Sequence, residues 1–142
     1  MRRPDGARPR VLFAEDSENA RVLTAALLTW MGCDVDAVED GEQALNQACR
    51  SAYDLILLDI EMPVMDGLIA ARSIRALGGS AASTPLMALS AFLADTSKCA
   101  RWHEIFDLAL AKPAGRDELR RAVARMLAPS SGARGVGAAE LT

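Results

Sequence analysis

Polar residues follow four short apolar runs of the sequence, at the points where the runs end. The runs read VLFA, LILL, PLMAL and LALA, and the residues directly behind them are Glu15 with Asp16, Asp59, Ser90 and Lys112. A carboxylate behind a run as apolar as LILL is costly to desolvate unless a cation compensates its charge. Because the carboxyl ends of parallel strands meet at one edge of a sheet, we expect three carboxylates, one hydroxyl and one ammonium group at a shared rim.

The chemistry of such a rim follows from the residue types. Clustered carboxylates raise one another's pKa unless a cation lies between them. A hard divalent ion with oxygen ligands fits this cluster, and Mg²⁺, which binds one or two carboxylates, waters and a phosphate, fits best. With the ion on Asp16 and part of Asp59, a free oxygen of Asp59 can attack phosphorus and form an acyl phosphate. Ser90 and Lys112 can then stabilise the charge on the phosphoryl oxygens.

Short apolar runs that predict strands alternate with longer amphipathic segments that predict helices. The expected strands are 11–14, 34–38, 55–58, 85–89 and 108–111. The expected helices are 18–31, 41–52, 67–77, 95–104 and 117–127, and the segment GGSAAST (78–84) is expected to be a flexible connection. In the first helix we expect one apolar stripe to face the core, formed by Val22, Leu23, Ala26, Leu27 and Trp30.

Five strand–helix units with continuous apolar strands predict an α/β fold, with helices on both faces of a parallel sheet in a three-layer sandwich. Only the segment DVDAV (34–38) alternates between polar and apolar residues, as an edge strand with one solvated face does. An edge position for the second strand favours the flavodoxin-like order 2-1-3-4-5. No G-x-G-x-x-G motif follows the first strand, so nothing in the sequence supports dinucleotide binding.

Length and charge limit the function classes further. The 142 residues suit one domain, and no apolar run is long enough to cross a membrane. Residues 11–127 hold 11 basic and 17 acidic residues, a net charge of −6, which argues against direct nucleic-acid binding. We expect a disordered basic arm at 1–9 and a disordered tail or linker at 128–142. Three widely spaced cysteines predict mostly buried, reduced thiols and a cytoplasmic protein.

Four motifs together are similar to those of one known family. They are ED (15–16), DIEMPVMDG (59–67), ALSA (88–91) and AKP (111–113). Over residues 10–127 the chain resembles the receiver domains of bacterial two-component response regulators. The sequences of its motifs are most similar to those of receivers attached to hybrid sensor histidine kinases. This resemblance implies a signalling phosphoacceptor rather than an enzyme, with a histidine kinase or a histidine phosphotransfer protein as its partner. A weak homodimer is a further expectation.

The resemblance also assigns roles to individual residues. It implies that Asp59 is the phosphoacceptor, that Asp16 binds Mg²⁺ directly, and that Glu15 acts on the ion through water. Glu61 would offer its backbone carbonyl to the metal. By the same resemblance, Ser90 and Lys112 would bind the phosphoryl group, and the bond between Lys112 and Pro113 would be cis.

The chain departs from the family at its output side. Receivers usually carry Tyr or Phe three residues before the lysine, where this chain has Ala109.

Two other functions compete with phosphoacceptance. An aspartyl-phosphate hydrolase of the haloacid dehalogenase type would need D-x-D after the first strand, but DIE stands mid-chain at 59–61. A pseudo-receiver used only as an interaction surface would not need the complete set of acids, serine and lysine.

Overall fold

The structure, a computed structural model, describes residues 6–62, 64–91 and 104–128. Five strands form one parallel sheet in the order β2-β1-β3-β4-β5. They are β1 (Arg10–Ala14), β2 (Asp34–Val38), β3 (Leu55–Asp59), β4 (Leu86–Ser90) and β5 (Leu108–Ala111). The predicted fold class, strand order and edge position of the second strand are confirmed, and each strand lies within one residue of its predicted bounds.

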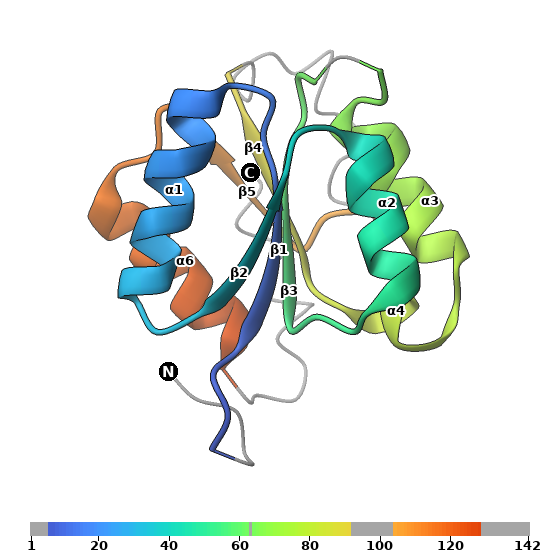
Figure 1. Cartoon of the computed structure of the whole chain (residues 1–142), viewed down its shortest axis with the longest axis horizontal. Coiled ribbons are helices and arrows are strands. Elements are labelled where there is room, and N and C mark those ends of the chain that lie inside the picture. Colours follow the sequence, from blue (N-terminus) through green and yellow to red (C-terminus); the bar gives the residue numbers. More distant parts are fainter. Residues whose placement is uncertain (1–5, 63, 92–103, 129–142) are drawn as a thin grey trace.

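Helices cover both faces of the sheet (Figure 1). On one face lie α1 (Glu18–Trp30) and α6 (Arg116–Leu127), and on the other α2 (Gly41–Arg50), α3 (Gly67–Ala76) and α4 (Gly79–Ser83). The alternation of side chains along the strands divides the core in the same way. In β1, Val11 and Phe13 join the cluster under α1 and α6, whereas Leu12 and Ala14 join the cluster under α2 and α3.

The predicted inward stripe of α1 is wrong for all of its residues except Leu27, which is partly buried and packs against the core. Val22, Leu23 and Trp30 are 62%, 64% and 71% exposed, and Leu28 is the buried residue of this helix. The helix is apolar around more than half of its circumference, so the spacing of apolar residues fits more than one orientation. The sheet selects the orientation that buries Leu28 and leaves a stripe of apolar side chains, which we call the α1 face, in contact with solvent: Val22, Leu23, Ala26 and Trp30.

The segment predicted as a flexible connection contains α4, and this expectation is also wrong. Arg75 binds the segment, because its guanidinium donates to the carbonyl oxygens of Ala82 at 3.0 Å and Thr84 at 2.6 Å. The same guanidinium pairs with Asp107 at 3.1 Å, and the Asp107 carboxylate accepts a hydrogen bond from the Leu86 amide at 2.9 Å. These contacts join α4 to β4 and to the start of β5, and no local sequence pattern predicts them.

Three smaller expectations have mixed outcomes. The second helix ends at Arg50, two residues before the predicted end. Cys33 is buried but Cys49 is exposed, and Cys99 lies outside the described residues, as does nearly all of the predicted helix 95–104.

Near the start of the chain, the Arg8 guanidinium donates to the carbonyl oxygens of Gly32 at 3.1 Å and Thr29 at 3.2 Å, at the end of α1. In the described part of the chain, no helix is both long and apolar enough to span a membrane.

Candidate functional site

The ends of four strands bring the predicted site residues together at one edge of the sheet. Glu15 follows β1, Asp59 ends β3 and Ser90 ends β4, and all three side chains are buried. Lys112 follows β5, where its backbone N–H donates to the Ser90 carbonyl oxygen at 2.9 Å and continues the pairing of the two strands. The parallel order of the strands is therefore what converts four distant sequence positions into one site.

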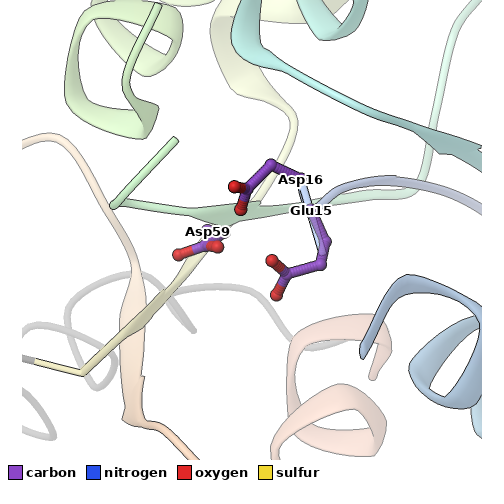
Figure 2. Close-up of side chains that lie close together, drawn as sticks. All are labelled: Glu15, Asp16 and Asp59. Atoms are coloured by element: carbon purple, nitrogen blue, oxygen red, sulfur yellow. The ribbon is translucent and has the colours of Figure 1, made fainter. Parts of the chain in front are cut away.

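Three carboxylates converge at this edge. Figure 2 shows the side chains of Glu15, Asp16 and Asp59 close together, and one oxygen from each lies within 4.8 Å of the others. Glu15 and Asp59 are 2% and 0% exposed, whereas Asp16 is exposed. An arrangement of carboxylate oxygens at the ends of two neighbouring strands, with one carboxylate open to solvent, can hold a hard divalent cation.

Lys112 supplies the positive charge that the cluster contains. Its Nζ lies 2.9 Å from Oδ2 of Asp59 and 3.2 Å from Oε1 of Glu15. The bond between Lys112 and Pro113 is cis, as the resemblance implied. One ammonium group faces three carboxylates, so the site as described keeps an excess of negative charge.

The pKa values of the buried groups respond to this excess. Burial, followed by the hydrogen bond with Glu15, raises the pKa of Asp59 from 3.8 to about 7, although Lys112 opposes the rise. Burial alone would raise the pKa of Glu15, but hydrogen bonds with Asp59 and the Ser17 amide and the charge of Lys112 outweigh it and lower that pKa. Desolvation would lower the pKa of Lys112, but the two carboxylates outweigh it and raise that pKa. The positive charge of Lys112 therefore does not outweigh burial and the neighbouring Glu15 at Asp59.

The loop behind Asp59 holds the phosphoacceptor candidate in place. Asp66 caps α3, because its Oδ1 accepts from the Ile69 amide at 2.9 Å. Gly67, the first residue of α3, lies directly against the backbone of Asp59. A Cβ at this position would lie within 3.0 Å of both the carbonyl carbon and the carbonyl oxygen of Asp59. The D-G pair at 66–67 therefore fixes the end of β3 as well as starting the helix.

Glu61 has a side-chain role that the sequence did not suggest. Its amide donates to Oδ1 of Asp59 at 3.1 Å, which turns the backbone of Glu61 toward the site. Its carboxylate accepts two further hydrogen bonds, from the Ser90 hydroxyl at 2.6 Å and from the Ala91 amide at 2.8 Å. The only signal in the sequence is that Glu61 and Ser90 follow strands that become neighbours in the sheet, which requires knowing the strand order.

Within the described part of the chain, hollows adjoin the carboxylates on two sides. A hollow of about 390 Å³ opens beside Asp16 and is lined by Glu18, Arg21, Glu39 and Asp40 as well. A smaller cavity of about 170 Å³ lies between α1 and α6 and is mostly apolar. Glu15 and Lys112 form part of its wall, and so does Leu23 of the α1 face. The site is therefore open to solvent on the acidic side and borders an apolar surface on the other.

Comparison with known sequences identifies the family. The profile of the family described as the response regulator receiver domain matches residues 11–124. This chain therefore belongs to the response regulator receiver domain family. Sensor protein GacS of Pseudomonas syringae is 37% identical over 117 residues, which cover 81% of this chain and 13% of GacS. The chain thus spans about an eighth of the length of that relative.

Solved structures agree with this assignment. The receiver domain of sensor histidine kinase PA1611 from Pseudomonas aeruginosa, solved with a magnesium ion coordinated in its active-site cleft, is 35% identical and has a TM-score of 0.76. The match covers 85% of this chain and 98% of that one. Response regulator TrrA of Thermotoga maritima, in complex with Mg²⁺ and BeF, is 33% identical with a TM-score of 0.74, over 84% of this chain and 99% of that one. The predicted resemblance to receivers of hybrid sensor kinases is confirmed.

Proposed function

We propose that this domain accepts a phosphoryl group on Asp59 from a phosphohistidine, in a Mg²⁺-dependent reaction, and relays or switches a signal. One observation carries this proposal: the buried Asp59 carboxylate ends β3 between the Lys112 ammonium and two further acids. A purely structural aspartate would not need three carboxylates around a single lysine, because burial and the neighbouring Glu15 together raise the pKa of Asp59 to about 7 and so disfavour its ionised form.

The transfer requires one bond to break and one to form. An oxygen of the Asp59 carboxylate attacks phosphorus, the O–P bond forms, and the N–P bond to the donor imidazole breaks with the electron pair staying on nitrogen. Lys112, already at the Asp59 carboxylate, lies where it can offset charge on the phosphoryl oxygens. The Ser90 hydroxyl, at the end of the neighbouring strand, is a second donor for those oxygens.

Mg²⁺ fits the residues at this edge. Glu15, Asp16 and Asp59 offer three carboxylate oxygens within 4.8 Å of one another, and the PA1611 and TrrA structures contain magnesium. We assign Asp16 and Asp59 as direct ligands, Glu15 as a ligand through water, and Glu61 as the donor of a backbone carbonyl. When bound, the ion supplies positive charge between the carboxylates and the incoming phosphoryl group.

The donor is a histidine kinase or a histidine phosphotransfer protein that docks on the α1 face. This face is exposed and apolar, and it begins beside the site, because Ser17 caps α1 and its amide donates to the Glu15 carboxylate at 3.2 Å. A helical partner could bury Val22 and Leu23 while its phosphohistidine reaches Asp59. We place the domain in the cytoplasm as a signalling module without direct nucleic-acid contact, with at most weak self-association.

The phosphoacceptor assignment is tested with Asp59→Asn, which keeps the shape of the side chain and removes the nucleophile. The parent should incorporate acid-stable, base-labile phosphate from a phosphorylated histidine protein, and the variant should not. Asp54→Asn is a control, because Asp54 precedes β3 and lies at the opposite end of that strand from the site. Incorporation at the parental rate in Asp59→Asn would refute the assignment.

The docking face is tested by comparing two phosphate donors. A small-molecule donor such as acetyl phosphate needs no docked partner, whereas a phosphohistidine protein does. Val22→Ser should slow transfer from the protein about tenfold and leave the small-molecule reaction unchanged. Leu77→Ser, at the end of α3 on the other face of the sheet and 41% exposed, is the matched control. Equal effects of the two variants on protein-donor transfer would place docking elsewhere.

A further inference from the structure

The Glu61 carboxylate holds two donors at the end of β4. Oε2 accepts the Ser90 hydroxyl at 2.6 Å, and Oε1 accepts the Ala91 amide at 2.8 Å. Each oxygen of the carboxylate therefore accepts one hydrogen bond, and the two donors belong to consecutive residues. The Glu61 amide is bound to Asp59 Oδ1 at 3.1 Å, so the residue links the phosphoacceptor carboxylate to the end of the neighbouring strand.

A hydroxyl group has one proton, and a backbone amide has one hydrogen. While Ser90 donates to Glu61, its hydroxyl cannot donate to a phosphoryl group on Asp59, and the same holds for the Ala91 amide. The two arrangements are mutually exclusive. Hydrogen bonds to an ionised acceptor are shorter and stronger than neutral ones, so the Glu61 carboxylate is a strong competitor for these two donors.

From these contacts, and resting on the proposed phosphoacceptor role of Asp59, we propose that the Glu61 carboxylate is a latch that holds Ser90 away from Asp59. It is a positioning residue that competes with the phosphoryl group for the Ser90 hydroxyl and the Ala91 amide. Phosphorylation must break both bonds before Ser90 can turn to Asp59. Glu61 thereby sets the equilibrium between two arrangements, one with Ser90 bound to Glu61 and one with Ser90 turned toward Asp59. This role is additional to offering its backbone carbonyl to the metal.

Charge acts in the same direction as the hydrogen bonds. A phosphoryl group on Asp59 brings new negative charge close to the Glu61 carboxylate, since the two residues are already joined through the Glu61 amide. The Glu61 carboxylate must therefore move away when the Ser90 hydroxyl and the Ala91 amide bind the phosphoryl group. A ligand shifts a two-state equilibrium by its differential interaction with the two states, so removing Glu61 should favour the phosphorylated arrangement.

The first test needs neither metal nor phosphate. In the metal-free protein, the ¹H shift of the Ala91 amide should be downfield, as expected for a bond to a carboxylate. Glu61→Ala should move it upfield, whereas Glu39→Gln should not. Glu39 lines the acidic hollow with Asp16 and pairs with Arg21 at 3.7 Å, so the control removes a nearby charge without a described contact to Ser90. An Ala91 amide that is indifferent to Glu61→Ala would overturn the latch.

The second test measures the affinity for beryllofluoride, a phosphoryl analogue, in the presence of Mg²⁺. Glu61→Ala should raise the affinity roughly five- to tenfold, as expected for the release of a charged hydrogen bond. Glu61→Gln, which keeps one acceptor oxygen, should give a smaller gain. In a Ser90→Ala background, the gain from Glu61→Ala should shrink to about twofold or less, because the hydroxyl it would release is absent.

The outcomes separate the latch from its alternatives. Equal gains with and without the Ser90 hydroxyl, or an equal gain in Glu39→Gln, would mean that Glu61 acts only through its charge, and the latch would be wrong. A loss of affinity in Glu61→Ala, with unfolding by urea unchanged, would also overturn it. If the parent does not bind beryllofluoride at all, the proposed function itself fails, and the latch fails with it.

Discussion

The Lys112 ammonium lies 2.9 Å from a carboxylate oxygen of Asp59, at the centre of a group that contains two more acids. Three carboxylates and one lysine leave a net charge of −2 when all are ionised. Because Asp59 and Glu15 are 0% and 2% exposed, solvent offsets little of this charge. The stability of the domain should therefore depend on cations and on pH, and both dependences can be measured.

Magnesium should stabilise the domain through Asp16. An ion that binds only the folded state at ten times its dissociation constant adds about 1.4 kcal/mol to the free energy of unfolding, which corresponds to a rise of a few degrees in Tm. The parent should show this rise in millimolar Mg²⁺, and Asp16→Ala should lose most of it together with phosphorylation. Glu18→Gln, which removes a charge from the same hollow, should keep both. A Tm indifferent to Mg²⁺ in the parent would contradict the metal site.

The pH dependence of stability should reveal the raised pKa of Asp59. Its folded pKa of about 7 exceeds its ordinary value of 3.8, so the folded state binds more protons than the unfolded state between these values. The corresponding stability is present below the ordinary pKa and is lost as pH rises through about 7. Glu15 has a lowered pKa and acts in the opposite sense, at more acidic pH.

Asp59→Asn, which stays neutral, removes this dependence. In metal-free buffer the variant should be roughly 1–3 kcal/mol more stable than the parent near pH 8, and the difference should shrink toward pH 5. Urea unfolding across this range provides the measurement. Millimolar Mg²⁺ should reduce the difference near pH 8 by stabilising the ionised parent. A difference that stays constant with pH would mean that Asp59 titrates normally.

Most of the site could be predicted because it depends on strand ends. The positions of Asp59, Ser90 and Lys112 required only the strand boundaries and the order of a parallel sheet. The orientation of α1 could not be predicted, because Leu28 and the exposed Val22 are both aliphatic. The spacing of apolar residues therefore does not show which of the two faces the sheet. The Arg75–Asp107 ion pair and the contacts of the Glu61 carboxylate join segments distant in the chain, so no local pattern indicates them.

Gly67 should be required for the position of Asp59. A Cβ at residue 67 would clash with the backbone carbonyl of Asp59, which cannot move aside as a flexible side chain can. Gly67→Ala should destabilise the fold by about 1–3 kcal/mol and slow phosphorylation by a small-molecule donor. Gly115→Ala is the control, because among the described residues no atom beyond its chain neighbours lies within 4 Å of a Cβ there. If both variants behave alike, the close approach at Gly67 has no consequence.

Ala109 should limit how far the signal spreads from the site. Receivers resembling this one usually carry an aromatic ring at this position, which swings inward when the hydroxyl at the Ser90 position moves. Ala109 is 6% exposed in the middle of β5 and has no side-chain rotamers. Phe106 cannot replace the ring, because it is 1% exposed within the core cluster shared with Ala88 and Ala109. We therefore expect a muted change around β5 and α6, with relay to or from a phosphohistidine protein as the main role.

Amide shifts of the free and the beryllofluoride-bound protein measure this spread. Large changes should be confined to Asp59, Ser90, Ala91, Lys112 and the loops that follow β1 and β3, because only there does the analogue change contacts directly. The rest of residues 104–127 should shift much less, since deleting a switched contact shrinks the difference between the two states that a ligand can exploit. Ser90→Ala should reduce the site changes further without altering those of α6. Shifts across 104–127 as large as those of the site loops would show that another group performs the coupling that Ala109 lacks.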